Sequence, residues 1–168
     1  MDMQTPTLEE VVEPHEASGQ GTALACLLEY APGVRVALPI HAGVELVEQP
    51  QAIPVPGMPE FAVGLMAWQG RQLALLDLAR YFHGPDAGAP AAAGHALVVA
   101  YQRAPGEAIE YGALLAPNLV RMIEVTDSLA CATPAQPARM EDVAVAAFSF
   151  QEQAVPVLEL SRIFALSG

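Results

Sequence analysis

Two segments, one in each half of the chain, repeat one pattern of apolar and acidic residues. Leu73–Phe82 reads LALLDLARYF, and Val155–Phe164, 82 positions later, reads VPVLELSRIF. Each has an apolar run, an acidic residue and then the spacing of one helical turn. A looser match lies earlier, where Ala-Pro-Gly at 31–33 precedes VRVALPI and Ala-Pro-Gly at 104–106 precedes EAIEYGALL. Chance could produce any single match, but two matches in the same order favour a duplicated β unit.

The repeat also predicts part of the hydrophobic core. Leu76, Leu158, Phe82 and Phe164 occupy equivalent places in the two copies, so we expect all four to be buried. The chain has 168 residues, of which 53% are apolar and only 15% are charged. It is therefore long enough to form one domain, or two very small ones, around a substantial core.

The charge of the chain restricts its partners. The net charge is −12, and all seven basic residues are arginines, so the sequence contains no lysine. This excludes a P-loop lysine, a Schiff base and a Ser-Lys dyad. Nucleic-acid binding is disfavoured as well, because phosphate neutralisation requires clustered Lys and Arg and these arginines are scattered. We therefore expect the partner to be a protein surface.

The start of the chain differs in composition from the rest. Residues 1–20 contain five acidic residues and no Lys or Arg, together with Pro6, Pro14 and Gly19, so we expect residues 1–21 to form a flexible acidic tail. A short helix over 8–12, formed only on a partner, is an unsupported alternative. The tail lacks the order of a secretory signal, and no apolar run approaches the roughly 20 residues that span a bilayer. We expect a cytoplasmic protein without direct membrane insertion.

The sequence offers no arrangement of residues for catalysis or cofactor binding. No histidine stands at metal-ligand spacing from a cysteine or another histidine, and no serine lies in a Gly-x-Ser-x-Gly elbow. Cys26 and Cys131 lie among apolar or small residues, where we expect buried free thiols rather than a disulfide. We therefore predict a binding protein, not an enzyme, without metal or cofactor. The four histidines are His15, His41, His83 and His95.

Short strand-like segments separated by Pro and Gly run through both halves. Together with the lack of a long amphipathic pattern, they predict an all-β pair of barrels rather than βαβ units. We expect an ordered proline-rich loop at 49–59, a joint between the halves at 83–94, and helical turns at 78–82 and 161–166. The predicted strands are 23–29, 34–38, 44–47, 61–68, 72–76, 95–101, 109–116, 120–125, 143–150 and 154–158.

Several of these features, in this order, resemble the CheW-type chemotaxis coupling proteins. The family pattern has an apolar-Glu-apolar strand, a proline-rich stretch, Pro-x-Phe-x-x-Gly, an Asn-Leu-Arg-Gly turn and a strand ending in Asp-Leu. The resemblance covers about Ala23 to Leu166, nearly everything except the tail. The matching segments are Val44-Glu45-Leu46, Ile53-Pro54-Val55-Pro56, Pro59 to Gly64, Ala67-Trp68-Gln69-Gly70 and Leu76-Asp77-Leu78.

The resemblance implies a fold and a set of partners. The fold would consist of two SH3-like five-stranded β-barrels, barrel 1 over about 22–85 and barrel 2 over about 86–168. The chain would be a non-catalytic adaptor that holds the cytoplasmic tip of a methyl-accepting chemoreceptor between its barrels. The barrel ends would meet the regulatory domain of a CheA-type histidine kinase. The partner-binding residues that the resemblance implies are Gly43, Glu45, Gly64, Trp68, Gln69 and Leu97.

Two of these residues are candidate binding residues from the sequence itself, without the resemblance. Glu45 lies between strand apolars, where an outward-facing acid is the plain interpretation, and Trp68, the only tryptophan, is more often a core residue than an interface anchor. The family turn has Arg in the place of Gln69, and that Arg commonly pairs with the Glu matched by Glu45. Gln69 can offer only a hydrogen bond, which favours an accessory adaptor of a type IV pilus (twitching) or gliding system. The alternative function is a double-barrel module that binds a small ligand or second messenger.

Overall fold

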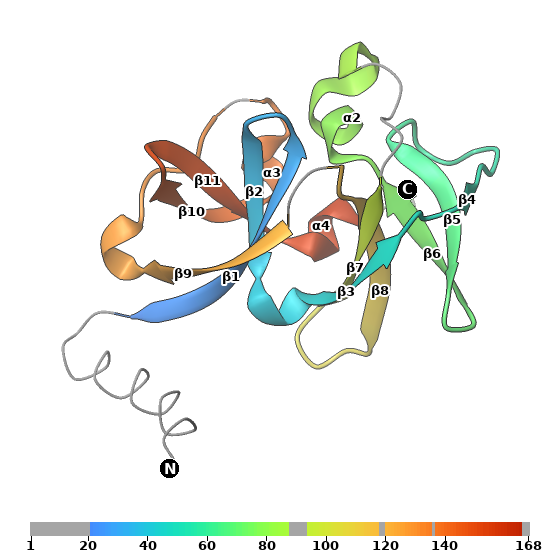
Figure 1. The fold of residues 1–168 in the computed structure, drawn as a ribbon, viewed down its shortest axis with the longest axis horizontal. Coiled ribbons are helices and arrows are strands. Elements are labelled where there is room, and N and C mark those ends of the chain that lie inside the picture. Colours follow the sequence, from blue (N-terminus) through green and yellow to red (C-terminus); the bar gives the residue numbers. More distant parts are fainter. Residues whose placement is uncertain (1–20, 88–93, 118–119, 136, 166–168) are drawn as a thin grey trace.

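Two curled β-sheets stand side by side, with short helices packed between and above them (Figure 1). The computed structural model describes residues 21–87, 94–117, 120–135 and 137–165. The expected all-β fold of two barrels is confirmed. Within the described ranges, no helix is long and apolar enough to cross a membrane. The predicted tail lies, except for Gly21, outside the described residues.

The first sheet, called sheet A, takes its strands from both ends of the chain. Its strand order is β10-β11-β2-β1-β9. Neighbouring strands are antiparallel except for β11 and β2, which run parallel and meet at Val157 and Ala37. The strands are β1 (Thr22–Ala31), β2 (Val34–Pro39), β9 (Val120–Thr126), β10 (Ala144–Phe150) and β11 (Gln153–Leu158).

The second sheet, called sheet B, takes its strands from the middle of the chain. Its order is β3-β7-β8-β6-β5-β4, and the parallel pair, β6 and β8, meets at Leu75 and Ala113. The two-residue β4 lies within the proline-rich stretch where the sequence predicts only a loop. The strands are β3 (Gly43–Glu48), β4 (Ala52–Ile53), β5 (Ala62–Trp68), β6 (Arg71–Leu76), β7 (His95–Gln102) and β8 (Ile109–Leu115).

The two halves of the chain exchange their first hairpins. The β1–β2 hairpin pairs with β9 and β11 of the second half, and the β7–β8 hairpin pairs with β3 and β6 of the first. The predicted barrels of 22–85 and 86–168 therefore differ from the structure, in which 22–39 and 120–158 form barrel A and 43–115 supplies barrel B. A 3-10 turn, η1 (Ile40–Ala42), carries the chain from one sheet to the other. The sequence pattern does not reveal this exchange, because pairing within or across the halves buries the same strand faces.

The 82-residue repeat is visible in the backbone. β5 begins at 62 and β10 at 144, and each has an irregularity in its pairing over its first three residues. β6 and β11 begin at 71 and 153, and the helices that follow, α2 (Leu78–His83) and α4 (Leu160–Ile163), begin at 78 and 160. The duplicated β unit inferred from the sequence is thus a structural repeat in this region.

The turns of the two repeated hairpins also match. Gln69 and Gly70 have positive φ in the β5–β6 turn, and Gln151 and Glu152 have positive φ in the β10–β11 turn. Two consecutive residues of this kind are characteristic of the type I′ turn, whose twist fits a two-residue hairpin. Three of the four are not glycine, so tertiary structure holds the turns in this conformation.

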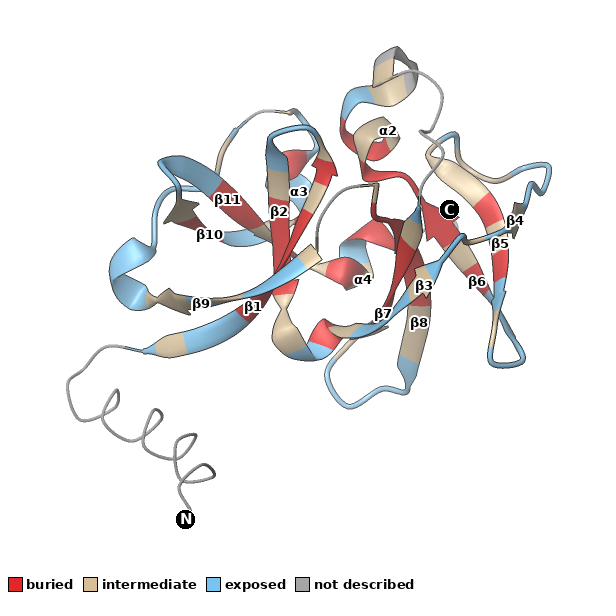
Figure 2. Ribbon diagram, in the orientation of Figure 1, coloured by how far each residue is buried: buried red, intermediate tan, exposed pale blue. Residues whose placement is uncertain are grey.

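Three clusters of buried apolar residues hold the sheets together. Figure 2 shows buried residues along the strands of both sheets. The largest cluster lies at the junction between the sheets and includes residues of α2, α4 and α3 (Met140–Val143). Barrel B is filled around Met66 and Leu75, and barrel A around Leu27 and Phe148. The predicted core is confirmed, since the junction cluster contains the buried residues Leu76, Leu158, Phe82 and Phe164.

One of the two thiol predictions is wrong. Cys26 is buried and free as expected, but Cys131 is exposed. Cys131 follows Ala130, which touches the edge of sheet A only through an isolated bridge to Phe148. Small neighbouring residues therefore indicated an irregular surface segment rather than a buried one.

Candidate functional site

The six residues implied by the family resemblance belong to sheet B and to the turn between β5 and β6. The structure gives them different surroundings: two are buried, two are intermediate and two are exposed. It brings two of them, Glu45 and Trp68, into direct contact. In order of exposure, the buried residues are Gly64 and Leu97, the intermediate ones are Gly43 and Trp68, and the exposed ones are Glu45 and Gln69.

Glu45 is held by the tryptophan rather than by the neighbouring glutamine. Trp68 Nε1 donates a hydrogen bond of 3.1 Å to Glu45 Oε1. The indole is itself fixed against Tyr111, with 5.3 Å between ring centroids, and the Arg71 guanidinium lies 4.9 Å from the Tyr111 centroid. Because Glu45 is exposed, water can solvate its other lone pairs and no cationic partner is required. Gln69 is left exposed at the tip of the β5–β6 turn.

Gly64 has a structural role that accounts for its presence. Its φ is 154°, and a Cβ built on it would overlap the backbone of Ile53 and Pro54. Glycine therefore allows β4 to lie close against β5. We assign Gly64 to the packing of sheet B and not to direct partner contact.

An apolar row crosses the junction between the two sheets. Met122 of β9 pairs with Cys26 of β1, and Leu46 of β3 pairs with Leu97 of β7. Gly43 lies between the buried members of the two pairs. A Cβ built on it would stand 3.7 Å from Cys26 Sγ and 3.9 Å from Leu97 Cδ1. Met122 and Leu46 are 62% and 45% exposed, whereas Cys26 and Leu97 are buried. The row therefore has a buried centre and an exposed apolar end on each sheet.

Two further residues widen the apolar row. Leu24, two residues before the cysteine of the row and on the same face of β1, is 52% exposed, and Val44, beside the glycine, is 43% exposed. Exposed apolar residues that gather in one place mark interaction sites more often than scattered ones do. Sequence reasoning did not identify Leu24, Leu46 and Met122 as site residues, because apolar residues in strand-like segments are typical of a core.

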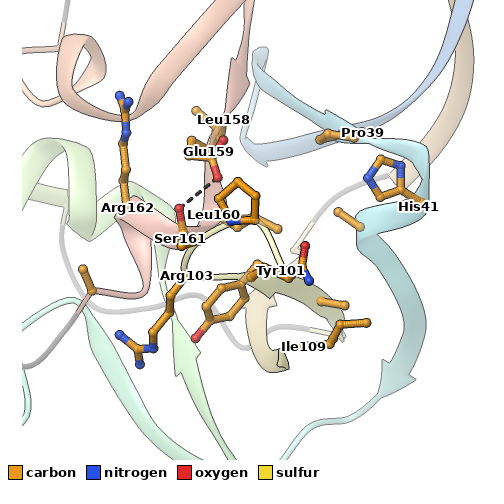
Figure 3. Close-up of a pocket in the computed structure, with 16 residues that line it drawn as sticks. Pro39, His41, Tyr101, Arg103, Ile109, Leu158, Glu159, Leu160, Ser161 and Arg162 are labelled. Carbon is orange, nitrogen blue, oxygen red and sulfur yellow. Dashed lines mark hydrogen bonds between the residues drawn. The ribbon is translucent and has the colours of Figure 1, made fainter. Parts of the chain in front are cut away.

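The junction also contains a cavity of about 910 Å³, shown in Figure 3. It is lined by η1, the β7–β8 hairpin and residues around α4. Its polar side chains bond to nearby protein groups: Arg103 Nε donates to Glu110 Oε2 at 2.6 Å, and Ser161 donates to Glu159 at 2.9 Å. The Arg103 hydrogen bond lowers the pKa of Glu110, and Arg162 donates to a backbone carbonyl oxygen. These bonds favour a structural role for the lining charges over binding of a small ligand.

Metal binding finds no support in the described part of the chain, where no group of three or more His, Cys, Asp or Glu residues could hold an ion. Among the same residues, the histidines do not gather with one another. His83 Nε2 lies 3.5 Å from the Tyr30 hydroxyl. His95 begins β7, and His41 lies in η1.

Comparison with known proteins identifies the family of the chain. A family model described as the CheW-like domain matches residues 26–167. The chain belongs to the CheW-like family. Among solved structures, this CheW-like chain is similar to the scaffolding protein TtCheW from Thermoanaerobacter tengcongensis, with a TM-score of 0.70 and 15% identity, covering 88% of this chain and 96% of that one. At this identity the likeness shows the fold. Comparison with curated proteins found no match.

Family membership also gives the broad class of function. The CheW-like family comprises scaffold proteins of chemotaxis signalling that act without catalysis, so the expectation of a scaffold or adaptor is supported. The exposed residues of the apolar row come from both sheets. A partner bound there would contact both barrels at once.

Proposed function

We propose that this CheW-like chain couples methyl-accepting chemoreceptors to a CheA-type histidine kinase in the cytoplasm. The apolar row carries the proposal, since Met122 and Leu46 present apolar side chains on either side of a buried centre. A helical receptor tip laid across the junction would cover both residues, as apolar helix faces do in other helix-in-groove complexes.

The kinase regulatory domain, which in this family has a similar double-barrel fold, would meet the barrel ends. The row lies between the barrels, where Cys26 of sheet A approaches Gly43 at the start of β3. Receptor and kinase would therefore occupy different surfaces and bind at the same time. This arrangement makes the two affinities separable by mutation.

Charged substitutions in the row provide the test. Leu46→Asp and Met122→Asp should each weaken binding of a hairpin peptide from a chemoreceptor tip by about tenfold or more, as expected when a contact worth about 1.4 kcal/mol or more is lost. Affinity for the isolated kinase regulatory domain should stay unchanged. The matched control is Ile109→Asp, because Ile109 is 56% exposed on β8 outside the row. Equal effects of all three variants on receptor binding would refute the proposed receptor surface.

We infer further that the chain serves as an accessory adaptor, in a twitching or gliding system. In support, Glu45 is satisfied by Trp68, and Gln69 stands where the family has an arginine. Gln69→Arg should raise affinity for a flagellar-type receptor tip, since a charge-assisted contact is stronger than a neutral one, and should leave kinase affinity unchanged. Gln151→Arg, in the equivalent turn of sheet A, is the control. Equal receptor affinity for the wild type and both variants would contradict this assignment.

A further inference from the structure

Barrel A is not closed by strand pairing. Its edge strands, β9 and β10, lie at opposite ends of sheet A. Among the described residues, the backbone of the segment after β9 bonds to β10 at the bridge between Ala130 and Phe148 and through the 3.0 Å bond from Cys131 N to Ala147 O. A cavity of about 310 Å³ lies along this seam. Its lining is mostly apolar and consists of Gly21, Thr22, Ala23, Val125, Thr126, Asp127, Ala130, Ala146, Ala147, Phe148 and Val157.

Small side chains leave this cavity unfilled. At the 82-residue offset, Val157 corresponds to Leu75 and Ala147 to Leu65 in sheet B. In sheet B, the strand β4 also covers β5 over two residue pairs. Within the described part of the chain, sheet A has a single isolated bridge at the equivalent place. An open apolar cavity beside two strand edges with little backbone pairing favours an occupant, since such edges otherwise promote association between molecules.

The chain enters the fold at this cavity. Gly21 N donates to Asp127 Oδ2 at 2.8 Å, and Asp127 N donates to Gly21 O at 3.0 Å, so the entry point is fixed at the rim. Residues 1–20 precede it. Between position 4 and Gly21, the large apolar residues are Leu8, Val11 and Val12. Eight residues lie between Val12 and Gly21, so the two positions can be up to about 30 Å apart when the chain is extended. These residues can therefore turn back into the cavity.

Charge at the other end of the seam complements the same segment. The guanidinium groups of Arg35 and Arg121 lie 5.6 and 5.7 Å from the ring centroid of Phe150. Arg35 also pairs with Glu29 at 3.7 Å and donates to Gln153 at 3.1 Å, so Arg121 is the cation that can attract a further carboxylate. Phe150 follows Phe148 by two residues on β10, about 7 Å along the strand. Residues 1–20 carry five acidic residues and no Lys or Arg. Two of the acids, Glu9 and Glu10, directly precede Val11. A segment with its valines in the cavity can thus direct these carboxylates along the seam.

We propose that residues 8–13 dock in the seam of barrel A of the same chain. Val11 and Val12 fill the apolar cavity, and Glu9 and Glu10 face Arg121, because Arg35 is already paired with Glu29. The segment then covers the edges of β9 and β10 and provides the contact that β4 provides in sheet B. This proposal concerns the chain alone and does not depend on receptor or kinase binding.

The test uses the full chain with a bimane fluorophore on Cys131, which is exposed beside the cavity, whereas Cys26 is buried. Val12→Trp should quench the fluorophore several-fold more strongly than Gln4→Trp, because tryptophan quenches only at short range. The native Trp68 is present in every variant and gives a constant background. Adding Ala146→Glu, a substitution at an exposed position lining the cavity, should abolish the extra quenching.

Two controls separate docking in the same chain from other origins of quenching. Arg121→Gln should reduce the quenching by Val12→Trp at low salt, and Arg103→Gln, at an exposed site in the β7–β8 turn, should not. Hydrogen exchange at 146–148 should be faster in Val11→Asp than in wild type. Equal quenching by Val12→Trp and Gln4→Trp, or quenching unaffected by Ala146→Glu, would overturn the proposal. Quenching that rises with protein concentration would overturn it too, since the occupant would then come from a second molecule.

Discussion

Barrels A and B share a strand plan but differ in how they are filled. Their repeated hairpins have matching register and matching turns. Barrel B nevertheless packs Leu73 and Leu75 where barrel A has the shorter Val155 and Val157. The comparison shows that duplication has preserved backbone pairing more closely than side-chain volume.

The barrels also differ in charge at one equivalent place. Glu45 of β3 pairs with Val98 of β7, and Arg121 of β9 pairs with Leu27 of β1, in the same position of each sheet. Each contacts the aromatic residue that ends the repeated strand: Glu45 accepts from Trp68, and Arg121 lies over Phe150. The same backbone position thus carries an acidic residue in barrel B and a basic residue in barrel A.

The strongest test of the equivalence concerns the junction. Leu76→Ala and Leu158→Ala remove fully buried side chains at matching positions, so each should lower the free energy of unfolding by about 2–5 kcal/mol. Urea denaturation measures both values. If the barrels are equivalent here, the two variants should lose nearly the same free energy of unfolding. An unchanged midpoint for either variant would contradict the repeat.

A smaller effect is expected where the junction is asymmetric. Gly112 of β8 is equivalent to Val36 of β2, and a Cβ on Gly112 would overlap the buried ring of Phe164. Gly112→Ala should therefore cost about 1–3 kcal/mol through overpacking. Gly43→Ala, where the nearest atom is 3.7 Å from the added Cβ, is the control and should change stability little. Thermal unfolding of both variants would show the difference, and equal melting temperatures would refute it.

Exchanging leucine and valine between the barrels tests the difference in filling. Leu75→Val should lower the free energy of unfolding by about 1 kcal/mol, because a buried methylene is lost. Val157→Leu adds a methylene group beside the cavity of barrel A, so this substitution should be neutral or stabilising. The two variants are compared by guanidinium denaturation. A loss of stability in Val157→Leu equal to that in Leu75→Val would mean that barrel A is already full.

The smallest expected effect appears only at high pH. Burial raises the pKa of Tyr30 from its ordinary value of 10.0 to about 12. The unfolded chain then loses this proton before the folded chain does, so the stability contributed by Tyr30 is complete below pH 10 and is lost as the pH approaches about 12. Tyr30→Phe should lessen this loss in unfolding experiments between those values. An identical pH dependence in wild type and variant would contradict the assignment.

The sequence predicted the repeated hairpins well because their determinants are local. The apolar run ending at Leu76 or Leu158, the acid that follows and the helical turn all act within ten residues. The exchange of hairpins could not be predicted, since Ala37 meets Val157 only in the folded chain. The same holds for the bond between Trp68 and Glu45, which are 23 positions apart. The apolar row was missed for a related reason: whether Met122 is core or surface depends on which strand lies beyond it.

The exchanged hairpins have a consequence for the origin of the chain. A polypeptide of half this length with the same strand pairings has no partner for its first hairpin, unless a second copy supplies one. Such a unit would exist as a symmetric pair of identical molecules, in which each molecule supplies two strands to the sheet of its partner. Fusion of the two genes would then have turned an interface between subunits into the junction that now holds Leu76 and Leu158.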